Sequence, residues 1–165
     1  DFAASLTERV ATLAGVPESA FETVLSQVTV TDGVPELIAA VHQAGGSVCV
    51  VSGGFHEILD PLAESLGLDE WKANRLEVSG GVLTGRVAGP IIDAQAKADW
   101  LQTWAREKNF DLSETVAIGD GANDLKMMAV AGKSIAFDAK PIVAEQADHS
   151  ISSRDMREAI SLIGL

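Results

Sequence analysis

The fold of this chain is decided by one stretch of its sequence, Thr115-Val116-Ala117-Ile118-Gly119-Asp120-Gly121-Ala122-Asn123-Asp124-Leu125-Lys126-Met127-Met128. Its apolar run, residues 116–118, is typical of the end of a buried parallel strand. Gly119 and Gly121 bracket Asp120, so the backbone can turn sharply there and approach a ligand closely. From Leu125 onward the pattern is helical. We therefore expect Asp120 at the carboxyl end of a parallel strand, where α/β sheets bind their ligands.

The acidic residues of this stretch indicate a metal site. Asp120 and Asp124 are carboxylates four residues apart, separated by small residues, and such a pair suits a hard cation such as Mg²⁺. A strand-to-helix turn with an acidic N-cap is the simpler interpretation. That interpretation explains one aspartate after a glycine, but it does not explain Asp120, Asn123 and Asp124 together, so the metal site is favoured.

Composition narrows the class of protein. The chain has 165 residues, enough for one domain with a real core, and its net charge of −12 argues against nucleic acid and anionic membranes as partners. No apolar run approaches membrane-spanning length, and no signal peptide is recognisable. The single cysteine, Cys49, lies in an apolar run and is interpreted as a small core residue. These features favour a cytoplasmic protein.

A second strand-to-helix corner follows the apolar residues 47–51. There the chain continues as Ser52-Gly53-Gly54-Phe55 and then into a predicted helix through Leu66. A serine hydroxyl and glycine amides at a helix N-terminus can bind an anion such as phosphate. A serine N-cap with flexible glycines explains the tripeptide equally well, so both interpretations stay open at this point.

Two cations lie on predicted amphipathic helices. Lys97, in a helix over residues 94–108, precedes Trp100 and Leu101 by one turn and falls on the same inward side. An inward lysine needs a negative partner, and we expect either a bound anion or Asp120. Arg9, in a helix over residues 2–14, is by its position alone a snorkelling arginine at the edge of an apolar stripe.

The remaining elements alternate between strand and helix. Residues 72–78 and 82–87 predict a β-hairpin, and further helices are expected to start at Pro17, Pro35 and Pro141. Short strands are expected at residues 135–137 and 148–151, with a closing helix over residues 155–162. This alternation predicts an α/β fold with a mostly parallel sheet, and a boundary near residue 31 separates an all-helical start from the rest.

The order of these motifs resembles that of the haloacid dehalogenase-like phosphatases, and within them the phosphoserine phosphatases. The resemblance is supported by the strings Val50-Val51-Ser52-Gly53-Gly54-Phe55, Ala73-Asn74-Arg75-Leu76, Leu83-Thr84-Gly85, Ala139-Lys140-Pro141, Asp1-Phe2-Ala3-Ala4-Ser5-Leu6 and Arg9-Val10-Ala11. It implies a Rossmann-like parallel-sheet core of the haloacid dehalogenase type with a partial helical cap. Residues 1–30 would be the C-terminal part of the cap, and residues 31–165 the core without its first strand.

The resemblance also implies roles for core residues. Ser52 and the Gly53 amide would hold the substrate phosphate, and Lys97 would neutralise both the phosphate and a nucleophilic carboxylate. Asn123 would reach the phosphate. Asp120 would ligate Mg²⁺ directly, while Asp124 would support the metal through water.

Two further residues would belong to the cap of such an enzyme. Arg9 would pair with the carboxylate of O-phosphoserine, and Phe2 would close over the site. Both roles are implied by the resemblance alone.

One family motif is absent from these residues. The motif Asp-x-Asp-x-Thr/Ser supplies the nucleophile, which forms an aspartyl phosphate, and the general acid/base, but no Asp-x-Asp occurs here. We expect it upstream of Asp1, in a longer chain or a separate peptide, on a strand between those that end at Val51 and Ile118. Residues 1–165 alone are then expected to form no closed sheet and to hydrolyse no phosphoserine.

The expected function is therefore Mg²⁺-dependent hydrolysis of O-phosphoserine in serine biosynthesis, and a homodimer is a possible assembly. One alternative is another small phosphomonoester phosphatase, or a phosphotransferase, of the same superfamily. A second alternative is a non-catalytic module that binds metal and phosphate. The absent nucleophile favours the module, while Arg9 and Lys97 disfavour it.

Overall fold

The computed structural model describes residues 1–165 and divides them into two compact units. The first unit comprises residues 1–29 and 49–93, and the second comprises residues 30–48 and 94–165. The chain passes from the first unit to the second after residue 29, and the domain boundary expected near residue 31 stays a prediction. The assignment of residues 1–30 to a cap stays a prediction. None of the helices combines the length and the hydropathy needed to cross a membrane.

The first unit combines three strands with three helices. In chain order they are α1 (Phe2–Ala11), α2 (Ala20–Gln27), β1 (Cys49–Phe55), α4 (His56–Leu66), β2 (Glu70–Ser79) and β3 (Val82–Ala88). The sheet order is β1-β2-β3, with β1 parallel to β2 and β2 antiparallel to β3. The hairpin expected from the sequence is thus confirmed.

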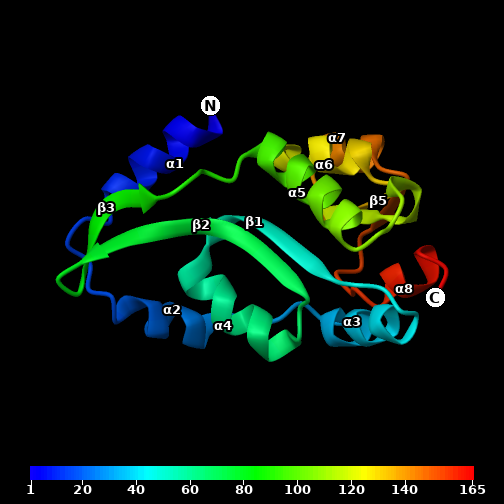
Figure 1. Cartoon of the computed structure of the whole chain (residues 1–165), viewed down its shortest axis with the longest axis horizontal. Coiled ribbons are helices and arrows are strands. Elements are labelled where there is room, and N and C mark those ends of the chain that lie inside the picture. The colour runs from blue at the N-terminus through cyan, green and yellow to red at the C-terminus, as the bar shows by residue number, and fades with distance from the viewer. The chain divides into compact units, whose positions relative to one another are not determined.

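Apolar residues at helical and strand spacing build the core of the first unit. Leu6 and Val10 of α1 pack with Leu76 of β2 and Leu83 of β3, and all four are buried. The C-terminal end of α1 approaches β3 closely, since a Cβ added at Gly85, where φ is +86°, would lie 3.2 Å from the Ala11 carbonyl oxygen. The helix α4 lies against β2 (Figure 1).

The second unit is an α/β sandwich with an all-parallel sheet of order β4-β5-β6. Its elements are α3 (Val34–Gln43), α5 (Ala94–Glu107), β4 (Val116–Gly119), α6 (Leu125–Val130), β5 (Lys133–Phe137), α7 (Pro141–Gln146), β6 (His149–Ile151) and α8 (Glu158–Leu162), with short 3₁₀ turns at Leu112–Glu114 and Ala122–Asp124. Leu37, Ile135, Ile151 and Ala159 form its buried core, which joins α3 and α8 to the sheet.

The structure confirms the predicted α/β class and corrects several details. The strands form two sheets of three rather than one, and β1 and β4 each stand at an end of their own sheet. The helix expected over residues 2–14 ends at Ala11, and the one expected from Pro17 begins at Ala20. Pro17 instead forms an isolated antiparallel bridge with Val82.

The strand expected to end at Val51 continues to Phe55. Ser52 is therefore part of a strand and not the N-cap of α4, which begins at His56. The N-cap interpretation of the Ser52-Gly53-Gly54 tripeptide is wrong, because Phe55 occupies the cap position.

Candidate functional site

The second unit brings together four of the residues singled out from the sequence, which we call the Asp124 cluster: Lys97, Asp120, Asn123 and Asp124. Asp120 follows directly after β4, as predicted, and Asp124 ends the short 3₁₀ turn before α6. Asp124 is 5% exposed and Lys97 is 7% exposed, so two ionisable side chains lie in the interior of this unit.

The carboxylate of Asp124 organises the cluster. Its Oδ2 accepts hydrogen bonds from the backbone N–H of Asp120 at 3.0 Å and of Gly121 at 3.2 Å. Its Oδ1 accepts a hydrogen bond from Lys97 Nζ at 2.7 Å. Since the carboxylate binds both backbone amides after β4, it holds the turn in one conformation and fixes the place of Asp120.

Gly119 makes this close approach possible. A Cβ at this position would lie 2.5 Å from the Asp124 Cβ and 2.7 Å from its Oδ2, which is too close for any side chain. The glycine before Asp120 is therefore required by the packing of Asp124 against the end of β4.

The inward direction of Lys97 is confirmed, and its partner within the chain is Asp124 rather than Asp120. A bound anion or Asp120 was expected from the sequence, whereas the structure pairs Lys97 with Asp124. The reason is geometric: Asp124 turns back into the unit to bind the two amides, which brings its other oxygen within reach of the α5 helix. Asp120 is exposed instead.

The donor set of the cluster suits a hard cation in part. The Asp120 carboxylate is exposed and accepts no hydrogen bond within the chain, so it can ligate a metal directly. Oδ2 of Asp124 already accepts two hydrogen bonds, but Oδ1 accepts only one, so Oδ1 can still accept from a metal-bound water, which favours indirect support. The chain holds no group of three or more His, Cys, Asp or Glu side chains that could hold a metal, so the remaining ligands of a bound Mg²⁺ would be waters and other groups.

The other predicted site residues lie in the first unit. The Ser52-Gly53-Gly54 segment belongs to β1, where the Ser52 Oγ accepts a hydrogen bond from the Gly54 N–H at 2.9 Å. Because that bond uses a lone pair of the hydroxyl, the Ser52 proton is left to be donated to a ligand.

Phe2 and Arg9 both lie on α1. Phe2 packs partly buried against the core formed by Leu6 and Val10. Arg9 is exposed, and its Nε donates to the Ser5 carbonyl at 3.3 Å. Its two terminal nitrogens hold no partner within the chain, which leaves the fork of the guanidinium open to an anion.

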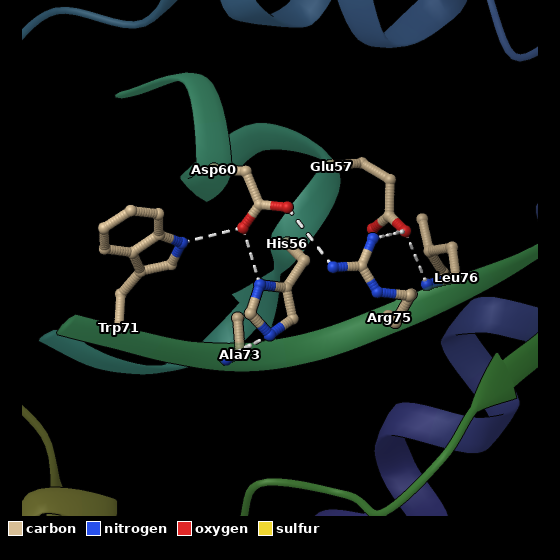
Figure 2. Close-up of polar contacts among 7 residues, drawn as sticks. All are labelled: His56, Glu57, Asp60, Trp71, Ala73, Arg75 and Leu76. Atoms are coloured by element: carbon tan, nitrogen blue, oxygen red, sulfur yellow. Dashed lines mark hydrogen bonds and ion pairs between the residues drawn. The ribbon is translucent and has the colours of Figure 1, made fainter. Parts of the chain in front are cut away.

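A polar network in the first unit, which follows the Ser52-Gly53-Gly54 segment, was not predicted from the sequence. His56, Glu57 and Asp60 of α4 bind backbone and side-chain donors of β2 (Figure 2). A signal was present, since His56 and Asp60 stand four residues apart at the start of a helix and so share one face. Asn74, which is fully buried, lies in one of the strings that carried the resemblance but received no role.

Comparison with known proteins shows the family. Residues 1–129 match the haloacid dehalogenase-like hydrolases. A phosphoserine phosphatase from Streptococcus thermophilus is 48% identical over 163 residues, which cover 99% of this chain and 76% of that protein.

Solved structures agree with this match. A probable phosphoserine phosphatase from Vibrio cholerae, in its unliganded form, superposes with a TM-score of 0.95 at 40% identity, covering 99% of this chain and 50% of that one. A phospho-aspartyl intermediate analogue of phosphoserine phosphatase superposes with a TM-score of 0.94 at 42% identity, covering 98% of this chain and 78% of that one. The chain therefore belongs to the haloacid dehalogenase-like hydrolases, and within them to the family of the phosphoserine phosphatases.

Proposed function

We propose that this chain is part of a Mg²⁺-dependent phosphatase that hydrolyses O-phospho-L-serine to L-serine and phosphate, a step of serine biosynthesis. The observation that carries the proposal is the 48% identity to the Streptococcus thermophilus phosphoserine phosphatase across nearly the whole chain. The single cysteine, which cannot form a disulfide within the chain, suits a reducing compartment such as the cytoplasm.

The charge of the transferred phosphoryl group explains which side chains the reaction needs. In the transition state of transfer this group carries negative charge on three oxygens, and fixed hydrogen-bond donors that face these oxygens lower the activation barrier. Lys97 would supply a positive charge to the phosphoryl oxygens, and Ser52 would donate its hydroxyl proton. Gly53 would donate its backbone N–H, which no side chain of its own can shield from the phosphate. The side-chain amide of Asn123 has no partner within the chain and offers a further donor.

Asp124 has a positioning role in this scheme. It holds Lys97 by a charge-assisted hydrogen bond of 2.7 Å, and it orders the turn that carries Asp120. Asp120 would ligate Mg²⁺ directly, and Asp124 would support it through water. When bound, the metal would supply positive charge next to the phosphate oxygens.

Arg9 and Phe2 would select the substrate from the cap. The open guanidinium fork of Arg9 matches a carboxylate, which phosphoserine carries and simpler phosphomonoesters lack. Phe2 would exclude water over the bound substrate. Residues 1–30 would accordingly form the C-terminal part of the cap and residues 31–165 the core.

The nucleophile and the general acid would come from outside residues 1–165, because no Asp-x-Asp occurs among them. β1 and β4 are each the last strand of their own sheet, which is consistent with a further strand beside them. The intact enzyme is defined as residues 1–165 together with a segment that carries this motif, either in one chain or as a separate peptide.

The test is an assay of phosphate release from O-phosphoserine with Mg²⁺. The intact enzyme is expected to turn over, and residues 1–165 alone are expected to be inactive. Lys97→Ala in the intact enzyme should lower turnover more than it weakens Mg²⁺ binding. Equal activity on all phosphomonoesters would point to a general phosphatase, and transfer to an added alcohol to a phosphotransferase.

A non-catalytic metal- and phosphate-binding module is the second candidate, favoured by the absence of an Asp-x-Asp motif in these residues. It predicts binding of Mg²⁺ and phosphate without turnover even in the intact enzyme. Phosphate release by the intact enzyme would reject it.

A further inference from the structure

The parallel ladder between β1 and β2 is interrupted at the Ser52-Gly53-Gly54 segment. Val51 pairs with Lys72 and Phe55 with Asn74, so three residues of β1 face the single residue Ala73 of β2. A bulge of this kind leaves backbone groups without their ladder partners, and buried groups need replacements.

Two side chains supply the replacements. The Ala73 N–H donates to Nε2 of His56 at 3.1 Å, in place of a backbone carbonyl. Asn74 donates from Nδ2 to the Gly53 carbonyl at 3.0 Å, and its Oδ1 accepts from the Ile92 N–H at 2.7 Å. A side-chain acceptor thus replaces the ladder partner of Ala73, a side-chain donor replaces that of Gly53, and the peptide that joins Gly53 to Gly54 is fixed in direction.

The contacts of His56 define its tautomer. Because Nε2 accepts from a backbone N–H, the ring proton sits on Nδ1, which donates to Asp60 Oδ1 at 2.7 Å. Asp60 also accepts from the indole N–H of Trp71 at 2.8 Å and from Arg75 Nη2 at 3.2 Å (Figure 2). Asp60 is therefore held on three sides and presents a fixed acceptor to the imidazole.

The next residue of α4 strengthens the same connection. Oε1 of Glu57 accepts from the Leu76 N–H at 3.1 Å (Figure 2). The first turn of α4 is thus joined to the backbone of β2 at two points, directly after the bulge.

We propose that His56 is a positioning residue that sets the conformation of the Ser52-Gly53-Gly54 bulge for phosphate, with Asp60 fixing its tautomer. This inference rests on the proposed function in so far as the bulge is the phosphate-binding segment. His56 does not touch the phosphate. It holds Ala73 opposite the bulge, so that the Ser52 hydroxyl and the Gly53 amide keep their directions.

A matched pair of substitutions separates the two nitrogens of the ring. In His56→Gln the amide oxygen can stand near the Nε2 position and still accept from Ala73. In His56→Asn the shorter side chain reaches only the Nδ1 position, and the bond to Ala73 is lost. Ala63→Gly is the control, since it weakens the same helix at a fully buried position away from the bulge.

The measurement is binding of inorganic phosphate to the intact enzyme, followed with the backbone amide resonance of Ala73. His56→Asn is expected to weaken phosphate binding and to raise KM about three- to tenfold, the effect of one neutral hydrogen bond, with a smaller change in kcat. His56→Gln and Ala63→Gly are expected to bind phosphate within about twofold of the unsubstituted enzyme. The Ala73 resonance should stay in Ala63→Gly, whereas its protection from hydrogen exchange should be kept in His56→Gln and lost in His56→Asn.

The proposal is overturned if His56→Asn and Ala63→Gly weaken phosphate binding equally. It is also overturned if His56→Gln binds phosphate as poorly as His56→Asn does. If His56→Asn does not fold, Asp60→Ala decides, because it removes the fixed acceptor at a partly exposed side chain; unchanged phosphate binding there overturns the proposal. If the intact enzyme binds phosphate but does not hydrolyse O-phosphoserine, the proposed function fails while this comparison still holds.

Discussion

Lys97 and Asp124 form a buried ion pair, with Nζ and Oδ1 2.7 Å apart and with only 9% and 7% of their side chains exposed. A buried charge is tolerated only when it is paired and hydrogen-bonded. The Asp124 carboxylate meets this condition, because it pairs with Lys97 and also accepts hydrogen bonds from two backbone N–H groups. The pair therefore links α5 to the turn after β4.

Removing the cation should leave Asp124 as an uncompensated buried charge. In the intact enzyme, Lys97→Met is expected to lower the free energy of unfolding by about 3–5 kcal/mol in a urea titration. The double variant Lys97→Met/Asp124→Asn should be more stable than Lys97→Met alone, because it removes the unpaired charge. Lys126→Met, at an exposed lysine, is the control and should change stability by less than about 0.5 kcal/mol. A Lys97→Met variant as stable as the control would contradict the buried pair.

A methyl group at Gly119 should disturb the Asp124 cluster. Gly119→Ala is expected to destabilise the intact enzyme by about 1–3 kcal/mol, because the added Cβ collides with the Asp124 Cβ. Gly121→Ala is the matched control, since its Cβ would meet only the Asn123 Oδ1, at the end of a flexible side chain. Urea unfolding of the two variants tests the difference, and equal losses would show that the close approach at Gly119 does not limit the turn.

Asp120 should be the direct protein ligand to Mg²⁺ in this chain. Bound Mg²⁺ at about 100 times its Kd raises the free energy of unfolding by about 2.7 kcal/mol, and Asp120→Asn is expected to abolish most of that gain. Asp138→Asn, at the exposed aspartate after the neighbouring strand β5, should keep it. Thermal unfolding with and without Mg²⁺ is the measurement. A metal-bound structure with Asp120 away from the metal would reject the assignment.

Asp60 should make the stability of the first unit sensitive to acid. Burial works against the ionised form, but hydrogen bonds from His56, Trp71 and Arg75 prevail and lower the pKa of Asp60 from its ordinary 3.8. A lowered folded-state pKa means that the stabilisation is fully present above about pH 3.8 and is lost as the pH falls through the lower folded value. Urea midpoints of the intact enzyme should therefore fall more steeply in this range than those of Asp60→Asn. Parallel curves for the two proteins would show that the network does not respond to this proton.

Arg9 should decide substrate choice. In the intact enzyme Arg9→Ala is expected to reduce kcat/KM about ten- to hundredfold for O-phosphoserine, the effect of losing a hydrogen-bonded ion pair. O-phosphoethanolamine, which lacks the carboxylate, should be affected far less. Arg106→Ala, at an exposed arginine of α5, serves as the control with both substrates. The same loss with both substrates would mean that Arg9 only packs on the α1 surface.

The elements of this fold could be predicted because their signals are local. Apolar runs bounded by glycine and aspartate gave β4 and its turn, and prolines correctly marked the starts of α3 and α7. The apolar residues one turn after Lys97, Trp100 and Leu101, predicted that its side chain points inward. Each of these signals depends on residues within a few positions of one another, which a sequence displays directly.

The partners of side chains could not be predicted, because they depend on where distant segments meet. Lys97 binds a residue 27 positions away, and the choice between Asp120 and Asp124 is decided by backbone amides that the sequence does not show. The bulge in β1 was missed for the same reason. Its replacement bonds from His56 and Asn74 exist only once β1, α4 and β2 have packed together.

The terminal place of β1 and β4 in their sheets affects how the chain behaves at high concentration. Each is the last strand of its own sheet, and an edge strand can pair with an extended segment of another molecule. Residues 1–165 on their own should therefore self-associate as their concentration rises, with the tendency suppressed when a complementary strand is supplied. Light scattering measured over a range of concentrations, with and without the complementary strand, would detect this self-association independently of any catalytic activity.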